Sequence, residues 1–262
     1  MILAVDIGNT SITAGLFRGK RLVYKTKFPT SKAGNGFSRK KRDPAIAGKP
    51  FPAGIIFSQV EAAVICSVVP KADPIIKQAI AGLGHIPIYI LGRDLMVPIK
   101  NLYGRPEQVG QDRLVCAWAA MKLYGAPVIA IDLGTALTFD AVSKNGEYLG
   151  GVILPGLNLS LNALHQGTAL LPQARLGKPG ALIGQDTKGS MLSGLVYGFG
   201  SLIDGLVEKL RREIGKKAKI VLTGGDARLI RQYCSNSYYF EPDLILKGLK
   251  DLAPRKKNAK KT

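Results

Sequence analysis

One pattern occurs twice in this chain and limits the folds that it can adopt. Residues 4–13 read AVDIGNTSIT, and residues 130–138 read AIDLGTALT. In each copy an apolar run ends on an aspartate, a glycine-containing corner with a threonine follows, and a second apolar run begins. A polar turn and a third apolar segment come next in both. The pattern therefore predicts the same strand, corner, strand, turn, strand unit twice.

The spacing of the two copies indicates two related domains. Asp6 and Asp132 are 126 positions apart, which is about the length of a small domain. A duplicated domain of this kind predicts an α/β protein with a cleft between its halves.

The aspartate–glycine–threonine corner suits phosphate binding. Glycine lets the backbone approach a ligand closely, and successive N–H groups with a threonine hydroxyl can donate to phosphate oxygens. An aspartate at the end of the strand can hold a cation or its water shell against those oxygens. A single copy could equally be an ordinary hairpin corner, because turns favour glycine and asparagine. Two copies at domain spacing favour the phosphate interpretation.

Composition places the chain among globular, cytoplasmic proteins. It has 262 residues, of which 46% are hydrophobic, enough for two modest cores. No apolar run reaches the roughly 18 residues that span a bilayer, and we expect no membrane association. Three cysteines without a C-x-x-C pair, at 66, 116 and 234, predict reduced and mostly buried thiols. His85 and His165, the only histidines, are expected to be structural.

The net charge of +19 is unevenly distributed. About half of it lies in residues 31–50 and 253–262, which are poor in core-forming residues. Such segments usually form solvated loops or tails. They could contact nucleic acid through phosphates, but no aromatic residues or nucleic-acid motif accompany them, so we do not expect nucleic acid as a partner.

Hydrophobic periodicity predicts strands and helices around the repeated units. Residues 28–54 contain several prolines and glycines and predict a long basic loop, residues 101–113 a turn-rich loop, and residues 172–190 a further loop. The predicted regular elements are a meander over 2–27, strands over 62–70 and 86–91, a strand followed by a glycine corner over 220–226, and helices over 72–83, 114–123, 157–164, 191–214 and 227–233.

Two further segments can carry chemistry. Asp112 lies in a glycine-rich loop between the repeats, where a carboxylate could accept the proton of an attacking hydroxyl while Arg113 pairs with an anionic acceptor. Asp112 could instead be only a helix N-cap or first-turn acid. The glycines of residues 223–225 could admit a nucleotide base or ribose, or could simply form a turn between a strand and a helix.

Five motifs in order resemble the type III pantothenate kinase family, which belongs to the actin, Hsp70 and sugar kinase superfamily. The resemblance extends from residue 1 to about residue 250. The motifs are DIGNT at 6–10, VGQDR at 109–113, DLGTA at 132–136, GGVILPG at 150–156 and TGG at 223–225.

The resemblance implies duplicated actin-like (ribonuclease H-like) domains, each with a central mixed sheet flanked by helices, and an ATP cleft between them. It implies a homodimer that phosphorylates pantothenate to 4′-phosphopantothenate with ATP, Mg²⁺ and a monovalent cation such as K⁺ or NH₄⁺. This reaction is the first step of coenzyme A biosynthesis. The domains expected are 1–113, which includes the basic loop 30–54, and 114–252, followed by a basic tail over 253–262.

The resemblance also assigns roles to residues. Asp112 would be the general base, Asp132 would bind the monovalent cation, and Asp6 would bind Mg²⁺, possibly through water. Pantothenate would contact Tyr103, Gly110, Gln111, Asp112 and Arg113, with Thr187 reaching it at or near the dimer interface. ATP would contact Asp6, Ile7, Gly8, Asn9, Thr10, Ser11, Ile12, Thr13, Gly134, Thr135, Gly224 and Gly225.

The chain departs from the family over residues 30–54, where relatives have a more regular, acid-containing segment, and in its basic tail. Two other functions stay open from the residues alone. One is a non-catalytic regulator on the same fold, whose basic arms contact nucleic acid. The other is a kinase for a different small hydroxyl compound, because one fold hosts many substrates.

Overall fold

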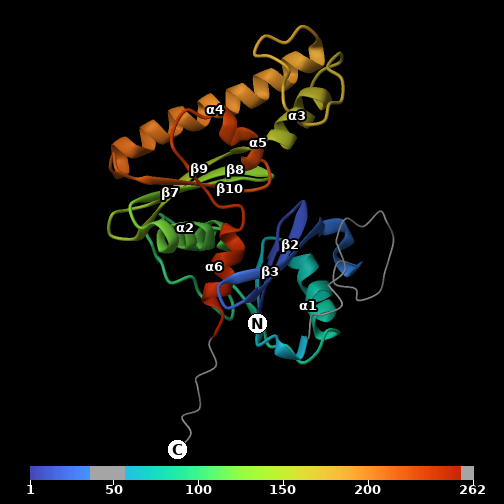
Figure 1. Cartoon of the computed structure of the whole chain (residues 1–262), viewed down its shortest axis with the longest axis vertical. Coiled ribbons are helices and arrows are strands. Elements are labelled where there is room, and N and C mark those ends of the chain that lie inside the picture. Colours follow the sequence, from blue (N-terminus) through green and yellow to red (C-terminus); the bar gives the residue numbers. More distant parts are fainter. Residues whose placement is uncertain (36–56, 255–262) are drawn as a thin grey trace, which may run out of the picture. The chain divides into compact units, whose positions relative to one another are not determined.

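A computed structural model describes residues 1–35 and 57–254 (Figure 1). These residues divide into two compact units. The first comprises Met1–Pro98, Gly110–Val115 and the chain from Ile245, and the second comprises Ile99–Val109 and Cys116–Leu244. The chain therefore passes between the units several times.

The first unit is built on a five-stranded mixed sheet with the order β3-β2-β1-β4-β5. Strands β1, β2 and β3 form an antiparallel meander, and β4 and β5 are parallel to β1. The strands are β1 (Ile2–Ile7), β2 (Ser11–Arg18), β3 (Arg21–Pro29), β4 (Ala62–Ser67) and β5 (Ile88–Ile90).

Helices cover both faces of this sheet. On one face, α1 (Asp73–Ala81) contributes Ile76 and Ile80 to a core that also contains Ile7, Ile12 and Ile65. On the other face, α6 (Leu244–Leu252) approaches β2, since the Lys250 ammonium lies 5.8 Å from the centre of the Phe17 ring. Short 3₁₀ turns occupy Thr30–Asn35, Phe57–Gln59 and Pro70–Ala72.

The second unit repeats this plan with a six-stranded sheet of order β11-β10-β7-β8-β9-β6. Strands β7, β8 and β9 form the antiparallel meander, and β10 lies parallel to β7 as β4 does to β1. The strands are β6 (Lys100–Asn101), β7 (Val128–Leu133), β8 (Ala136–Val142), β9 (Glu147–Pro155), β10 (Lys219–Thr223) and β11 (Tyr239–Phe240).

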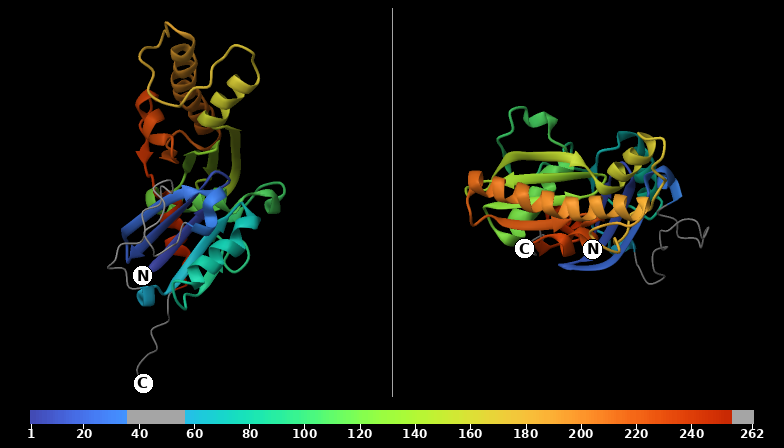
Figure 2. Two further views of the ribbon diagram at one scale, coloured as in Figure 1. Left: turned by 90° about the vertical axis from the view of Figure 1, so that its right-hand side faces the viewer. Right: turned by 90° about the horizontal axis from the view of Figure 1, so that it is seen from above.

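The long helix α4 (Thr187–Ile214) runs across one face of the second sheet (Figures 1 and 2). Its Val196, Ile203 and Val207 are completely buried in a core with residues of β7, β8 and β10. The remaining helices of the unit are α3 (Leu157–Gln166) and α5 (Ala227–Ile230), with 3₁₀ turns at Pro106–Gln108 and Arg231–Tyr233. Helix α2 (Gln111–Tyr124) begins in the first unit and continues into the second.

Strand irregularities confirm the duplication. The β2–β3 ladder shifts register between Leu16 and Phe17, and the β8–β9 ladder shifts between Ala141 and Val142. The two irregularities occupy equivalent positions in the two units. Each follows, at the same distance along the strand, the threonine that pairs with Asp6 or Asp132. The predicted fold, two related mixed sheets flanked by helices, is therefore confirmed.

Several element boundaries predicted from the sequence were wrong, including those of β3, α2 and α4. Strand β3 continues to Pro29, which an edge strand tolerates, and a 3₁₀ turn follows, so the loop predicted over 28–54 starts later; residues 36–56 lie outside the described part. Helix α2 begins at Gln111, which places Asp112 in its first turn. Helix α4 begins at Thr187, because the Asp186 side chain accepts a hydrogen bond from the Gly189 N–H at 2.7 Å and caps it.

Within the described residues, α4 is the one helix long and apolar enough to be compared with a membrane span. A core helix meets the same criterion, and the buried residues of α4 pack on the second sheet. We therefore interpret α4 as a core helix. No disulfide joins the three cysteines within the described residues, and Cys66 and Cys116 are buried while Cys234 is half-buried, so the predicted burial is confirmed.

Asp204 on α4 fixes the segment that leads into β11. Its carboxylate accepts hydrogen bonds from the Ser235 N–H at 2.6 Å, the Asn236 side-chain amide at 2.9 Å and the Tyr238 hydroxyl. Burial raises the pKa of Asp204, but these hydrogen bonds outweigh burial and leave it below its usual value.

We predict that Asp204→Ala lowers the free energy of unfolding by about 2 kcal/mol, because the donors lose a charged acceptor. Glu208→Ala, one turn further along α4, should change it by less than about 0.5 kcal/mol, since Glu208 is exposed and forms only a surface ion pair. Urea denaturation measures both. Because the pKa of Asp204 is lower in the folded protein than in the unfolded chain, this residue stabilises the fold only while its carboxylate is charged. The loss of stability caused by Asp204→Ala should therefore shrink as pH falls below about 4. Equal losses in the two variants would contradict this role.

Candidate active site

The first corner lies at the end of β1. Asp6 pairs in register with Thr13 on β2, and both are partly exposed. Ile7 and Ile12 are fully buried in the core, so only their backbone could serve the ATP contact predicted for them. Within the corner, the Gly8 N–H donates to the Ser11 carbonyl at 3.1 Å.

The corner is also fixed from outside, by a residue that the sequence did not single out. The Thr30 hydroxyl donates to the Gly8 carbonyl at 2.6 Å, and the Thr30 N–H donates to the Thr10 carbonyl at 3.1 Å. Asn9 and Thr10 are exposed at the tip, where a ligand can reach them. A threonine directly after a strand carries no recognisable signal for this role.

Asp6 and Asp112 lie close to the same thiol. Asp6 pairs with Cys66 on β4, on the sheet face opposite the Ile7 core. Burial raises the pKa of the Cys66 thiol well above its usual value, and the charges of Asp6, Asp112 and Asp73 raise it further. The fold therefore brings the first turn of α2 to the strand end that carries Asp6, within the first unit.

The first turn of α2 contains three of the six residues predicted to hold pantothenate, Gln111, Asp112 and Arg113, and a fourth, Gly110, directly precedes it. The Asp112 carboxylate accepts the Arg113 N–H at 2.9 Å, and a side chain on Gly110 would lie 2.4 Å from that carboxylate. Gln111, Asp112 and Arg113 are all partly exposed. Asp112 is thus a first-turn helix acid, which is the structural alternative considered above, and that position is also compatible with proton transfer.

The second corner joins the remaining predicted phosphate residues in the second unit. Asp132 pairs with Thr138 on one side and Thr223 on the other. Gly224 has a φ of +94°, and a Cβ there would lie 2.4 Å from Asp132 Oδ1 and 2.5 Å from the Leu133 nitrogen. Thr135 and Gly225 are exposed beside them. This corner is one residue shorter than the first. The Gly134 N–H donates to the carbonyl of Ala136 at 3.0 Å, whereas the Gly8 N–H of the first corner donates to that of Ser11, one position further along.

Tyr103 packs on the second sheet. Its ring would lie 3.2 Å from a Cβ on Gly150, and its N–H donates to Asn101 Oδ1 at 3.0 Å. An ion pair of 2.8 Å between Lys100 and Glu147 fixes the start of this loop on β9. The first glycine of the GGVILPG motif, Gly150, therefore leaves room for Tyr103. The sequence drew attention to the motif but did not indicate its partner.

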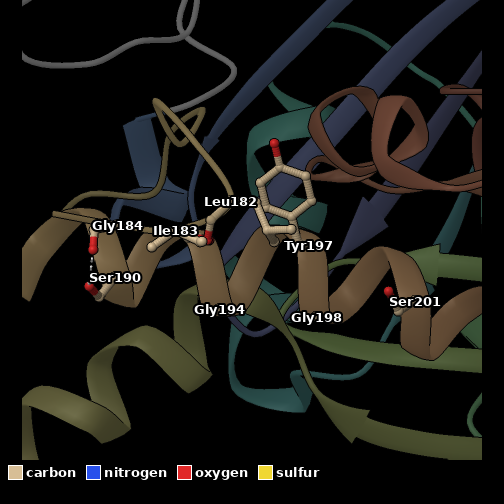
Figure 3. A pocket seen from close by; sticks show the side chains of 9 residues that line it. Leu182, Ile183, Gly184, Ser190, Gly194, Tyr197, Gly198 and Ser201 are labelled. Carbon is tan, nitrogen blue, oxygen red and sulfur yellow. Dashed lines mark hydrogen bonds between the residues drawn. The ribbon is translucent and has the colours of Figure 1, made fainter.

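Thr187 is exposed at the start of α4, whose following turns form one wall of a groove of about 530 Å³ (Figure 3). The groove is lined by small and polar residues of the helix and by Leu182 and Ile183, which are 62% and 81% exposed. Tyr197 projects beside Leu182 at this groove (Figure 3). Large apolar side chains exposed in this way indicate a surface that a partner covers.

A hollow of about 720 Å³ adjoins the Gly225 turn in the second unit. Arg175, Lys178 and Arg228 give it positive charge, while Asn158 and Asn162 of α3 supply amides. It lies beside the glycine turn where the sequence predicted a nucleotide base or ribose. The loop residues of this hollow, 173–178, were not predicted, because they lack any local motif.

The residues present fit Mg²⁺ held mainly through water. Within residues 1–35 and 57–254, no group of three histidine, cysteine or acidic residues is arranged to hold a metal. Mg²⁺ keeps several waters and typically binds one or two carboxylates plus substrate phosphates, so a single carboxylate such as Asp6 meets its needs.

The two related mixed sheets flanked by helices define a fold of the actin-like class. Solved structures agree on the fold. A Campylobacter jejuni protein described as a Baf family transcriptional activator has a TM-score of 0.57 at 18% identity, covering 95% of this chain and 96% of that one. Component A of the (R)-2-hydroxyglutaryl-CoA dehydratase of Acidaminococcus fermentans has a TM-score of 0.50 at 13% identity, covering 96% and 95%.

Sequence comparison gives the family. The type III pantothenate kinase family matches residues 2–209. A type III pantothenate kinase of Persephonella marina is 39% identical over 96% of this chain and 98% of its own length, and one of Agathobacter rectalis is 37% identical over 99% of each. The chain belongs to the type III pantothenate kinase family. Members of this family phosphorylate pantothenate with ATP in coenzyme A biosynthesis. The activity expected from the sequence is therefore confirmed at the level of the family.

We predict that Gly224→Ala destabilises the second unit and displaces Asp132, because a methyl group must enter space already filled by that carboxylate at a positive φ. The expected loss is about 2 to 4 kcal/mol. Gly215→Ala is the matched control, since its φ is +120° and the nearest atom to its Cβ is 3.9 Å away. That variant should lose only about 1 to 2 kcal/mol. Chemical denaturation compares them, and equal losses would show that Gly224 is not tightly packed.

Proposed function

We propose that this chain transfers the γ-phosphoryl group of ATP to the 4′-hydroxyl of pantothenate, with Asp112 as the general base. The observation that supports these roles is the proximity of Asp6 and Asp112 to the Cys66 thiol on one face of the first unit. A proton acceptor and a phosphate corner are then in the same compact unit, which suits a reaction that depends on positioning.

In this proposal, the chain mostly positions its substrates. Phosphoryl transfer proceeds through a loose transition state, so oriented donors and charge contribute more than a strong base. Residues Asp6 to Thr13 bind phosphate in the first unit, and Gly134 with Thr135 binds phosphate in the second. Asp112 accepts the proton of the pantothenate hydroxyl as the phosphoryl group transfers.

The remaining contacts orient the two substrates. Arg113 pairs with the pantothenate carboxylate, and Tyr103, packed on Gly150, holds the rest of that molecule together with Gly110 and Gln111. The exposed turn at Gly224 and Gly225, with the basic hollow beside it, accommodates the nucleoside of ATP. These assignments follow the family resemblance, and the exposure of the residues is compatible with each of them.

Two cations complete the site. Asp6 would hold Mg²⁺ directly or through water, and the ion would supply positive charge beside the phosphate groups of ATP. Asp132 binds a monovalent cation, K⁺ or NH₄⁺. Asp132 Oδ1 and the Leu133 carbonyl oxygen lie 2.4 and 2.5 Å from the Cβ position of Gly224, and this pair of nearby oxygens supports the role, because a large monovalent ion takes several oxygen ligands at once.

We further propose a homodimer in the cytoplasm, formed through the groove along α4. The exposure of Leu182 and Ile183 at that groove supports it, since large apolar side chains are usually covered by a partner. Thr187 at the start of the same helix would then reach pantothenate at or near the interface.

Asp112→Asn tests the proposed base. We expect turnover with pantothenate to fall by about 100-fold or more while ATP affinity stays unchanged, because the amide keeps the shape of the side chain but cannot accept the proton. Coupled measurement of ADP release gives turnover, and fluorescent nucleotide titration gives affinity. Asp73→Asn is the control, since Asp73 also lies near Cys66 but has no assigned role, and it should retain turnover within about threefold. Wild-type turnover in Asp112→Asn would exclude Asp112 as the base.

A further inference from the structure

Gln111 packs against a turn that none of the five motifs contains. Gln111 is the first residue of α2 and directly precedes Asp112. A Cβ at Gly92 would lie 2.8 Å from Gln111 Cγ and 2.9 Å from Cδ. Gly92 also has a φ of +82°, a conformation that side chains other than glycine rarely adopt. Both observations indicate that the position of Gln111 requires glycine at residue 92.

The turn that carries Gly92 is firmly built. Its ends are joined by a hydrogen bond of 2.7 Å from the Gly92 N–H to the Leu95 carbonyl. The Asp94 carboxylate accepts the Ile90 N–H at 2.8 Å and also binds the Arg93 guanidinium through two contacts of 2.9 and 2.7 Å. These bonds keep the turn in one conformation.

The same turn is attached to the sheet beside the proposed site. The Leu91 N–H donates to the Ile65 carbonyl at 2.8 Å, and Ile65 is the neighbour of Cys66 on β4. All of these residues belong to the first unit. A continuous set of contacts therefore runs from the sheet through the turn to the first residue of α2.

Packing holds the Gln111 amide oxygen on the turn without a hydrogen bond to it. This Oε1 atom is buried and accepts no hydrogen bond from the described residues. Because no donor fixes the oxygen, the side chain will move if the space beside it is filled. The orientation of the first helical turn then depends on the space that Gly92 leaves.

We propose that Gly92 is a positioning residue for Asp112: by accommodating Gln111, the turn over residues 90–95 sets the orientation of the first turn of α2. This inference rests on the proposed role of Asp112 as the base. It assigns a function in catalysis to a residue that touches neither substrate.

A double-mutant cycle tests the proposal, using Gly92→Ala, Gln111→Ala and the two together. In Gly92→Ala we expect kcat with pantothenate to fall about tenfold or more, because small misplacements of a catalytic group are costly, while the KM for ATP stays unchanged. In the double variant, kcat should return to the level of Gln111→Ala alone, since alanine at 111 lacks every atom that the new methyl group would meet.

Gly19→Ala is the matched control for the cost of a positive φ. Gly19 has a φ of +60° in the β2–β3 turn, and no atom lies within 4 Å of its Cβ position. We expect Gly19→Ala to lose about as much stability as Gly92→Ala but to keep the wild-type kcat. Equal kcat in Gly92→Ala and Gly19→Ala, or losses that simply multiply in the double variant, would overturn the proposal.

A second pair of variants decides the question if Gly92→Ala does not fold. Asp94→Ala loosens the exposed turn without adding atoms near Gln111, and Asp94→Asn keeps an acceptor for the Ile90 N–H. We expect a lower kcat in Asp94→Ala and recovery in Asp94→Asn, with ATP affinity unchanged in both. Wild-type kcat in Asp94→Ala would contradict the positioning role. Full activity in Asp112→Asn would instead reject the base itself, so the two failures are distinguishable.

Discussion

The alternation of side chains along β1 is the constraint on which the proposed site depends. Ile7 points into the core together with Ile12 and Ile65, which forces Asp6, Thr13 and Cys66 onto the opposite face. A shift of one residue in this register would bury Asp6 among apolar side chains, at a cost of several kcal/mol for an unpaired charge. The hydrophobic core therefore fixes where the carboxylate lies, and the start of α2 brings Asp112 to the same face.

The second unit uses the same constraint for a different purpose. Its strands repeat the pairing and even the irregularity at Ala141 and Val142, but its corner is shorter by one residue, and Gly224 closes around Asp132. In the first unit the charges of Asp6 and Asp112 both act on the Cys66 thiol. Duplication thus supplied two similar corners, and small changes in loop length and in neighbouring glycines separated the proposed roles of their aspartates.

Strong local patterns made much of this predictable from sequence. The repeated corners and the β-meander gave the fold, and five spaced motifs gave the family. The element boundaries were harder to predict, since Gln111 and Thr187 begin helices where glycine-rich sequence suggested loops. Long-range partners were not predictable at all. Thr30 at the first corner, Gly150 beneath Tyr103 and Gly92 against Gln111 lie far along the chain from the residues they support, and no local pattern reveals such contacts.

If these residues act together as proposed, they direct phosphate from ATP to the hydroxyl of pantothenate. Phosphorus NMR of the purified protein with ATP, Mg²⁺, K⁺ and pantothenate measures this transfer directly. We expect one new phosphomonoester resonance, coupled to the 4′-methylene protons of pantothenate and growing in equal amount with ADP. Release of inorganic phosphate at the same rate with and without pantothenate, and no new ester, would contradict it.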